Sequence, residues 1–246
     1  MLNLNRGKKI ILYVIRHGDP IYDPDSLTEK GHLQAKALAK RLAVNGLDKI
    51  YTSPMNRARQ TAQPTCELLG ITPEIEDWTS EAYTWQEFTF NDPELDGKLN
   101  WCFHVQTTRY KTPEVLALGD KWYEAEPFCQ TKAKEGYERI QRESDKFLEK
   151  LGYKREGMNY KILSPNEERV AVFCHQGFGT TWLSHLLAIP PVLYWSTFDM
   201  NHSSMTIVHF KNNPDGYTAP ICLAVSDTSH FHAEGLPLKF ANKIDI

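Results

Sequence analysis

The hydrophobic positions of the chain first indicate a short strand near its beginning. Residues 10–15 form an unbroken apolar run, Ile-Ile-Leu-Tyr-Val-Ile, made largely of β-branched and aromatic side chains. Such a run predicts a strand that is buried on both faces, as strands of parallel sheets are. The apolar residues 170–174 predict a second strand of this kind, and residues 48–52 predict a shorter third one. Two further runs, at 204–210 and 221–225, predict the last strands.

Helical periodicity follows the first strands. Residues 27–42 have amphipathic spacing, and Thr28 is placed to cap the N-terminus of a helix. The predicted buried face of this helix comprises Leu33, Ala37, Leu38 and Leu42. A second helix is predicted over 54–69, with Pro54 at its first position and Gly70 as its stop.

Two more helices are predicted in the second half of the chain, over 134–151 and 179–187. The apolar face of the longer one comprises Tyr137, Ile140, Phe147, Leu148 and Leu151. Strands that alternate with helices in this way indicate βαβ units, and therefore an α/β fold with a parallel sheet.

Residues 84–133 interrupt this alternation. The segment holds nine of the 28 aromatic residues of the chain. Such a density of aromatic side chains is wrong for a disordered linker, so we expect the segment to fold. It is either a cap over a functional site or a folded insertion that packs on the domain far from such a site.

Composition places the chain among ordinary globular proteins. Its 246 residues fit one large α/β domain or two small ones, with 41% hydrophobic and 24% charged residues. A net charge of −3 argues against a nucleic-acid partner. The five scattered cysteines form no Cys-x-x-Cys pair and favour reduced thiols in the cytoplasm. The run at 10–15 is too short for a membrane span or a signal peptide, so we expect no membrane association.

The candidate chemistry lies where two of the predicted strands end. Arg16 and His17 follow the first strand, and His175 follows the strand at 170–174. Open α/β sheets bind ligands at the carboxyl ends of their strands. There an imidazole can act as a nucleophile, and a guanidinium can hold an anion through two parallel hydrogen bonds.

Three ordered motifs carry a resemblance to a known family. They are Arg16-His17-Gly18 after a strand, the segment Ser53–Ala62 with the pattern Ser-Pro-x-x-Arg-Ala-x-x-Thr-Ala, and a strand that ends in His175. The chain resembles the histidine phosphatase superfamily, also called the phosphoglycerate mutase-like family. Weaker matches are the Leu27-Thr28-x-x-Gly31 opening of the first helix and a terminal segment with Asp227 and His230.

The resemblance implies a three-layer α/β/α, phosphoglycerate mutase-like fold with a mostly parallel central sheet. Residues 1–246 would form a single domain, and 84–133 would be an inserted, cap-like, aromatic-rich segment, because family members commonly carry insertions at this point. The family likewise implies a small-molecule phosphate ester as the substrate. It implies no metal and no cofactor.

By the same resemblance, His17 becomes a phosphohistidine, and Arg16, Arg57 and His175 form the cationic group around the phosphoryl oxygens. A histidine accepts a phosphoryl group only through an unprotonated nitrogen. We therefore expect the other ring nitrogen of His17 to donate to a nearby backbone carbonyl. Arg59, two positions from Arg57, would face elsewhere on the helix and remain on the surface.

A carboxyl group is also required, to protonate the leaving alcohol and then to deprotonate the attacking water. The family places this residue after the second helix, where Glu81 stands in a loosely matching Ser-Glu-Ala-Tyr context. The remaining candidates are Asp19, Glu76, Asp77 and Glu87.

The sequence departs from the family pattern at two places near the expected phosphate site. Pro20 replaces a hydroxyl residue and removes a backbone donor. Gln176 stands where a glycine is common; its backbone would still bind phosphate, and its side chain would narrow the pocket or contact the substrate. Both changes bear on substrate choice.

Three functions are compatible with these residues. The leading one is a phosphatase that hydrolyses phosphate monoesters. A mutase would return the phosphoryl group to a retained intermediate, and a catalytically weak protein would only bind phosphoesters. The two histidines at 230 and 232 could share a metal, but no convergent carboxylates accompany them. The sequence does not predict the oligomeric state.

Overall fold

A mixed sheet of six strands forms the centre of the molecule. The computed structural model describes residues 9–241 and 243–245. The strand order is β13-β11-β1-β10-β4-β5; β1, β10, β4 and β5 pair in parallel, and β11 pairs antiparallel with both of its neighbours, β1 and β13. The strands span Lys9–Arg16 (β1), Lys49–Thr52 (β4), Glu74–Ile75 (β5), Arg169–Cys174 (β10), Met205–Lys211 (β11) and Ile221–Asp227 (β13).

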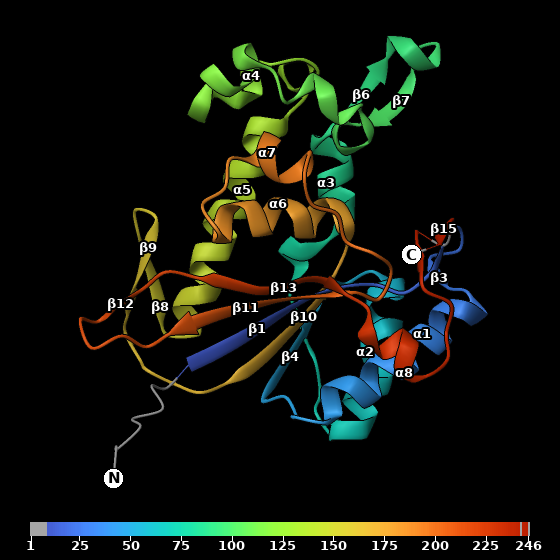
Figure 1. The fold of residues 1–246 in the computed structure, drawn as a ribbon, viewed down its shortest axis with the longest axis vertical. Helices are drawn as coiled ribbons and strands as arrows, with labels where there is room; N and C mark the ends of the chain where they lie inside the picture. The colour runs from blue at the N-terminus through green and yellow to red at the C-terminus, as the bar shows by residue number, and fades with distance from the viewer. Residues whose placement is uncertain (1–8, 242, 246) are drawn as a thin grey trace.

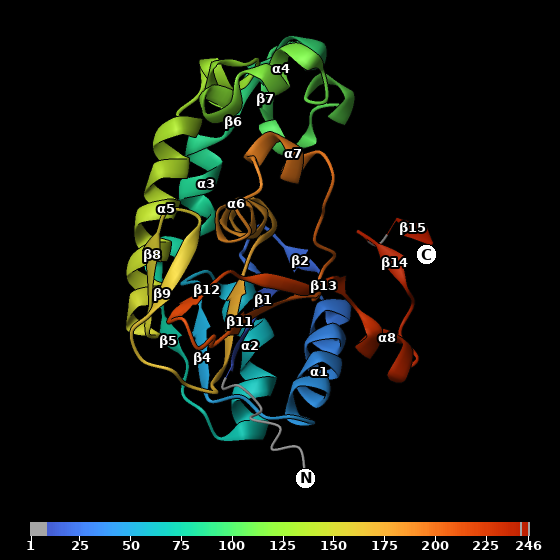
Figure 2. The same cartoon turned by 60° about the vertical axis from the view of Figure 1, so that its left-hand side comes forward.

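Helices cover both faces of this sheet (Figures 1 and 2). On one face lie α1 (Glu29–Ala43) and α2 (Asn56–Leu69), with the short α8 (Ser229–Ala233) beside α1. On the other lie α5 (Ala133–Lys150) and α6 (Gln176–Leu186). The predicted three-layer α/β/α architecture is therefore confirmed.

Alternate residues of β1 explain why the sheet needs both helical layers. Leu12 and Val14 pack in the core under α5 and α6, whereas Tyr13 and Ile15 pack in the core under α1. All four side chains are buried. Because successive side chains point to opposite faces of a strand, an unbroken apolar run is stable only between two layers.

The first two helices differ from the prediction in details that have physical reasons. Thr28 caps α1 as predicted, accepting a hydrogen bond from the Gly31 N–H, but Leu33 is 52% exposed and does not belong to the buried face. The position of Pro54 was also predicted wrongly, because α2 begins at Asn56. The N–H of Asn56 donates to Asp25 from a distant loop, which caps the helix at this later residue.

Helix α6 begins at Gln176, three residues before the predicted start. The predicted bounds of α5 agree with the structure to within one residue. Within the described residues, no helix combines the length and apolar character needed to cross a membrane.

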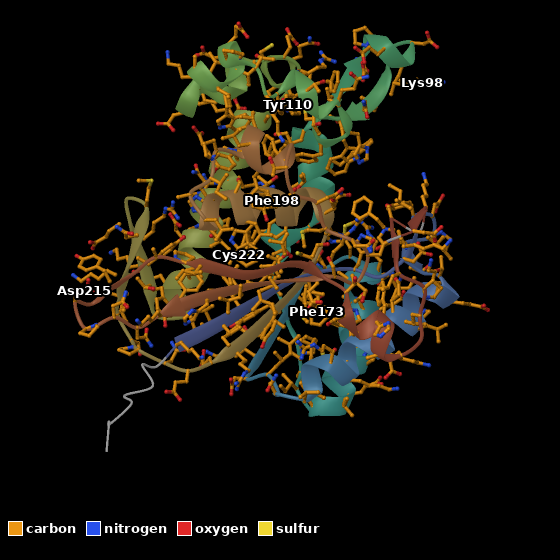
Figure 3. All side chains as sticks on the ribbon, viewed as in Figure 1. Lys98, Tyr110, Phe173, Phe198, Asp215 and Cys222 are labelled. Atoms are coloured by element: carbon orange, nitrogen blue, oxygen red, sulfur yellow. The ribbon has the colours of Figure 1, made fainter. Side chains whose placement is uncertain are left out.

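Residues 84–133 fold into a unit with its own core at one end of the molecule (Figure 1). They include most of α3 (Glu81–Glu87), the hairpin β6–β7 (Thr89–Asp92 and Lys98–Trp101), α4 (Pro113–Ala117) and several 3₁₀ turns. Buried aromatic residues of this unit pack against Trp195 of α7 (Pro191–Trp195). Figure 3 places Tyr110 and Lys98 at this end, far from Phe173 in the sheet.

Short strands complete the fold, and the sequence analysis predicted none of them. They are β2 and β3 (Pro20–Ile21 and Ser26–Leu27), β8, β9 and β12 (Tyr153–Glu156, Asn159–Ile162 and Tyr217–Thr218), and β14 and β15 (Lys239–Phe240 and Ile244–Asp245). Each is two to four residues long, too short for hydrophobic periodicity to reveal.

Candidate active site

The parallel strands bring the predicted site residues together at one edge of the sheet. The N–H of His17 donates to the carbonyl of Cys174 at 2.9 Å, and the N–H of Ser53 donates to that of Phe173 at 2.9 Å. These bonds align the carboxyl ends of β1, β4 and β10. The rings of His17 and His175 consequently lie 5.2 Å apart between centroids.

His17 has the hydrogen bond expected of a nucleophile. Its Nδ1 lies 2.7 Å from the carbonyl oxygen of Gly18, which can only accept, so Nδ1 carries the proton and Nε2 the lone pair. Burial lowers the pKa of His17 well below its usual 6.5, and His175, Arg16 and Arg57 lower it further. The ring therefore stays neutral at physiological pH.

Glycine at position 18 allows the loop after β1 to lie against the start of α1. A β-carbon on Gly18 would come within 2.8 Å of the Gly31 carbonyl oxygen. The Gly18 N–H donates to the Thr61 hydroxyl at 2.9 Å, which ties the loop after β1 to α2. The motifs around residues 18, 31 and 61 therefore have a shared packing role.

Both arginines are buried, and each is held by a specific partner. Arg16 donates from Nη1 to the carbonyl of Met200 at 2.5 Å and from Nη2 to Nε2 of His202 at 3.0 Å. Arg57 pairs with Asp25 at 2.7 Å between Nη1 and Oδ1. The Nε atoms of Arg16 and Arg57 are buried without a hydrogen-bond partner among the described residues. Two guanidinium groups with unused donors are suited to binding an anion.

His175 is fully buried beside His17 and is not among the described residues that line the cavity at the site. Its Nε2 lies 2.8 Å from the Ser53 hydroxyl. Burial lowers its pKa well below 6.5, and the charges of Arg57 and Arg16 add to that effect. Ser53, the first residue of the second motif, therefore orients this histidine.

Glu81 begins α3 and reaches across to the first turn of α6. Its two carboxylate oxygens accept hydrogen bonds from the N–H groups of Gly177 and Phe178, each at 2.9 Å. Burial raises its pKa above 4.5, while these two hydrogen bonds and the nearby arginines oppose the rise. The carboxylate also caps α6, which explains why that helix begins earlier than the apolar pattern predicted.

The four other candidate acids have different partners. Asp19 accepts from the Thr28 hydroxyl at 2.7 Å and lies 3.6 Å from His202. Glu87 forms two hydrogen bonds of 2.7 Å with Arg139. Glu76 accepts from Trp78 and Lys150, and Asp77 accepts from Tyr83. None of these four carboxylates is among the described residues that line the cavity at the site.

That cavity has a volume of about 780 Å³, within the range of sites for small molecules. Arg16, His17, Arg57 and Glu81 lie on its wall. The segment 84–133 supplies a further part of the wall with Trp85, Gln86, Leu99, Asn100, Trp101, Phe103 and His104. The insertion and the predicted catalytic residues therefore border the same cavity.

Gln176 also lines this cavity, and its side-chain amide donates to Asp199 at 2.5 Å. The backbone phosphate contact predicted for Gln176 stays a prediction. Arg59 is exposed, as expected for a surface residue. His230 is buried in α8 and contacts Phe231, and no group of three or more potential metal ligands occurs among the described residues.

Sequence reasoning missed His202, which stands close to the nucleophile. The ring centroids of His202 and His17 are 5.9 Å apart. Because the Arg16 guanidinium donates to Nε2 of His202, that nitrogen must be unprotonated, and burial lowers the pKa of His202 to about 3. No motif marks this residue, because it lies in a loop before β11 and reaches the site only through the fold.

These buried neutral histidines predict a loss of stability in acid. Below pH 6.5 the unfolded chain binds protons that His17, His175 and His202 do not bind in the folded protein. The free energy of unfolding should then fall by up to about 1.4 kcal/mol per pH unit for each such histidine. Urea denaturation at pH 7, 6 and 5 measures this slope, and His202→Gln should reduce it. Equal stability at pH 7 and pH 5 would contradict the burial of neutral rings.

Comparisons with known proteins agree with the geometry. The model of the histidine phosphatase superfamily (branch 1) matches residues 12–94. An adenosylcobalamin/alpha-ribazole phosphatase of Salmonella typhi is 28% identical over 193 residues, covering 75% of this chain and 83% of that protein. A 2,3-bisphosphoglycerate-dependent phosphoglycerate mutase of Bartonella tribocorum is 42% identical over 76 residues, covering 26% of this chain and 35% of the mutase.

Solved structures share the fold. A phosphoserine phosphatase of Entamoeba histolytica superimposes with a TM-score of 0.56 at 20% identity, covering 90% of this chain and 98% of that one. A mycobacterial glucosyl-3-phosphoglycerate phosphatase gives a TM-score of 0.57 at 17% identity, covering 90% and 99%. With three motifs in order at one edge of this fold and a family model that covers the first two of them, the chain is similar to the histidine phosphatase superfamily (branch 1).

Proposed function

We propose that the protein is a phosphatase that hydrolyses small phosphate monoesters through a phosphohistidine on His17. The observation that carries the proposal is the hydrogen bond from Nδ1 of His17 to the Gly18 carbonyl. It leaves a neutral ring with its Nε2 lone pair on the wall of a cavity that Arg16 and Arg57 also line. A nucleophile and two fixed cations at one point are what phosphoryl transfer requires.

In the first half-reaction, Nε2 of His17 attacks phosphorus, and the bond from phosphorus to the ester oxygen breaks. Glu81, as the neutral acid, gives its proton to the departing oxygen. Arg16, Arg57 and His175 bind the other phosphoryl oxygens as their charge redistributes. The Gly18 carbonyl stabilises the proton on Nδ1, which becomes more acidic once Nε2 carries phosphorus.

In the second half-reaction, water attacks the phosphohistidine, and the bond from phosphorus to nitrogen breaks. The Glu81 carboxylate accepts a proton from this water, which restores the acid form, and the neutral ring of His17 is regenerated. These side chains supply the positive charge and the proton transfer between them, so the scheme uses no metal and no cofactor. The backbone N–H of Gln176 would add a donor to the bound phosphate.

The insertion at 84–133 acts as a cap in this proposal, because it supplies one wall of the cavity at which hydrolysis takes place. A partly closed cavity limits access of bulk water and selects substrates by the shape of the leaving group.

The five cysteines are all free thiols, which favours a reducing compartment and hence the cytoplasm.

A mutase is the second candidate. It is supported by the 42% sequence identity with the Bartonella mutase over 76 residues. Against it, Arg16 and Arg57 are the only arginines among the described residues lining the cavity, and no lysine joins them. A mutase intermediate with two anionic groups would need more positive charge. A protein that binds phosphoesters without turnover is a third candidate.

Hydrolysis of para-nitrophenyl phosphate in the presence of EDTA separates these functions. The expected result is stoichiometric release of nitrophenol and free phosphate from pH 5 to pH 7. In a parallel incubation with a phosphoglycerate, formation of its isomer with little free phosphate would instead indicate a mutase. Binding without release of either product would indicate the phosphoester-binding protein and overturn the proposal.

A further inference from the structure

The insertion presents a continuous group of aromatic rings to the cavity. Trp85 and Trp101 meet edge to face at 5.0 Å, and Phe103 lies 5.4 Å from Trp101 between ring centroids. All three line the cavity. Trp85 is 38% exposed. Exposed indole surface in a concave site is typical of ligand contact.

The three rings of Trp85, Trp101 and Phe103 form an aromatic wall, and this wall begins where the leaving group must lie. A β-carbon placed on Gly177 would come within 2.5 Å of the Trp101 ring, 2.8 Å of the Phe103 ring and 3.0 Å of Oε1 of Glu81. The two rings and the proposed acid therefore surround one point on the first turn of α6. Because Glu81 protonates the ester oxygen, the group attached to that oxygen extends along these rings.

The charges around the cavity argue for an uncharged leaving group. Both arginines of its described lining, Arg16 and Arg57, are used for the phosphoryl group, and no lysine lines it. Near the rings lie the acid Glu81 and the imidazole of His104, and burial lowers the pKa of His104, so neither supplies a fixed positive charge. A second anionic group on the substrate would lie beside this acid without a cation of its own.

We propose that the preferred substrates are phosphate monoesters whose leaving group carries an uncharged flat aromatic ring that stacks on Trp101 and Trp85. This inference rests on the proposed phosphatase function and names its substrate class. Stacking of a flat ring on an aromatic side chain lowers KM or raises kcat/KM by roughly 5- to 100-fold. Aryl-containing metabolites and nucleoside-like esters share this chemistry.

A pair of substrates with similar leaving-group acidity tests the inference. For 2-naphthylmethyl phosphate and hexyl phosphate the departing groups are both primary alcohols, so a difference in kcat/KM reports binding of the ring. The expected result is at least about 10-fold higher kcat/KM for the naphthyl ester, mainly through a lower KM. A substrate with a second anionic group, 5-carboxypentyl phosphate, should be poorer than hexyl phosphate.

Two variants and a matched control locate the effect. Trp101→Ala and Trp85→Ala should each reduce the preference toward 1, whereas Trp101→Phe should keep most of it. Tyr83→Ala is the control, because Tyr83 lies on the same helix as Trp85 and is similarly exposed, at 39%, but does not line the cavity. Circular dichroism checks that each variant folds. If Trp101→Ala does not fold, Trp85→Ala still tests the inference, because Trp85 is partly exposed and its removal disturbs less packing.

The outcomes distinguish this inference from the proposed function. Equal kcat/KM for the two esters, or an unchanged preference in both tryptophan variants, would overturn the aromatic substrate class while leaving the phosphatase intact. If no ester is hydrolysed, the proposed function fails, and calorimetric binding of 2-naphthylmethyl phosphonate against hexyl phosphonate still tests the ring preference. Equal affinity for the two phosphonates would then overturn it.

Discussion

Replacing His17 with alanine should lower turnover of para-nitrophenyl phosphate by at least about 10⁴-fold, as expected when a covalent nucleophile is removed. The neighbouring histidine is not placed to take over the role of His17. The second ring, His175, has its Nε2 within 2.8 Å of the Ser53 hydroxyl, whereas the Gly18 carbonyl fixes His17 in the tautomer that a nucleophile needs. The variant should still bind phosphate through the two arginines.

Chemical labelling checks this result more directly than the rate does. Brief incubation with a ³²P-labelled ester, followed by denaturation, should leave acid-labile label on the wild-type protein and none on His17→Ala. His32→Ala is the control, because His32 is exposed on α1 and is not among the described residues that line the cavity. Persistent labelling of the His17 variant would remove this residue as the nucleophile.

Replacing Glu81 with glutamine should slow hydrolysis of alkyl phosphates by about 10²- to 10⁴-fold, the range for loss of a general acid. The effect should be smaller for para-nitrophenyl phosphate, whose leaving group needs no proton. Burial raises the pKa of Glu81, so the acid form persists to higher pH than for an exposed glutamate. Wild-type kcat/KM on alkyl esters should therefore decline as pH rises through that raised pKa.

A comparison of leaving groups across pH measures this role. In Glu81→Gln the decline of kcat/KM for alkyl esters with rising pH should disappear, and the difference in kcat/KM between para-nitrophenyl phosphate and the alkyl esters should widen. Glu87→Gln is the matched control, since Glu87 lies on the same helix and pairs with Arg139 away from the cavity. If Glu87→Gln or Asp19→Asn produced the larger loss instead, the acid would have to be reassigned. Glu81→Gln should also destabilise the protein by about 1 kcal/mol, because one amide oxygen replaces the two oxygens that accept the Gly177 and Phe178 N–H groups.

The sheet and the positions of its functional residues were predictable from sequence because the signals are local. The run at 10–15 is buried on both faces, and the same is true of residues 170–174, so hydrophobicity alone identifies both strands. Parallel strands then place Arg16, His17 and His175 at one edge without further information.

Features that depend on distant partners were not predictable. The apolar pattern could not show that Glu81 would cap α6, and so it placed the start of that helix at residue 179. It also assigned Leu33 to the core, where Gln34 is buried instead and accepts a hydrogen bond from the Asp19 N–H. The proximity of His202 to Arg16 likewise arises from tertiary contacts across most of the chain.

The position of β1 in the middle of the sheet determines at which stage of synthesis the active site can form. Its two neighbours in the sheet, β10 and β11, both belong to the last third of the sequence. During synthesis the strand that leads into His17 therefore leaves the ribosome long before either pairing partner exists. A nascent chain that ends before residue 169 already contains Arg16, His17, Arg57 and Glu81, yet lacks β10, the strand that pairs with both β1 and β4 and so brings these residues together.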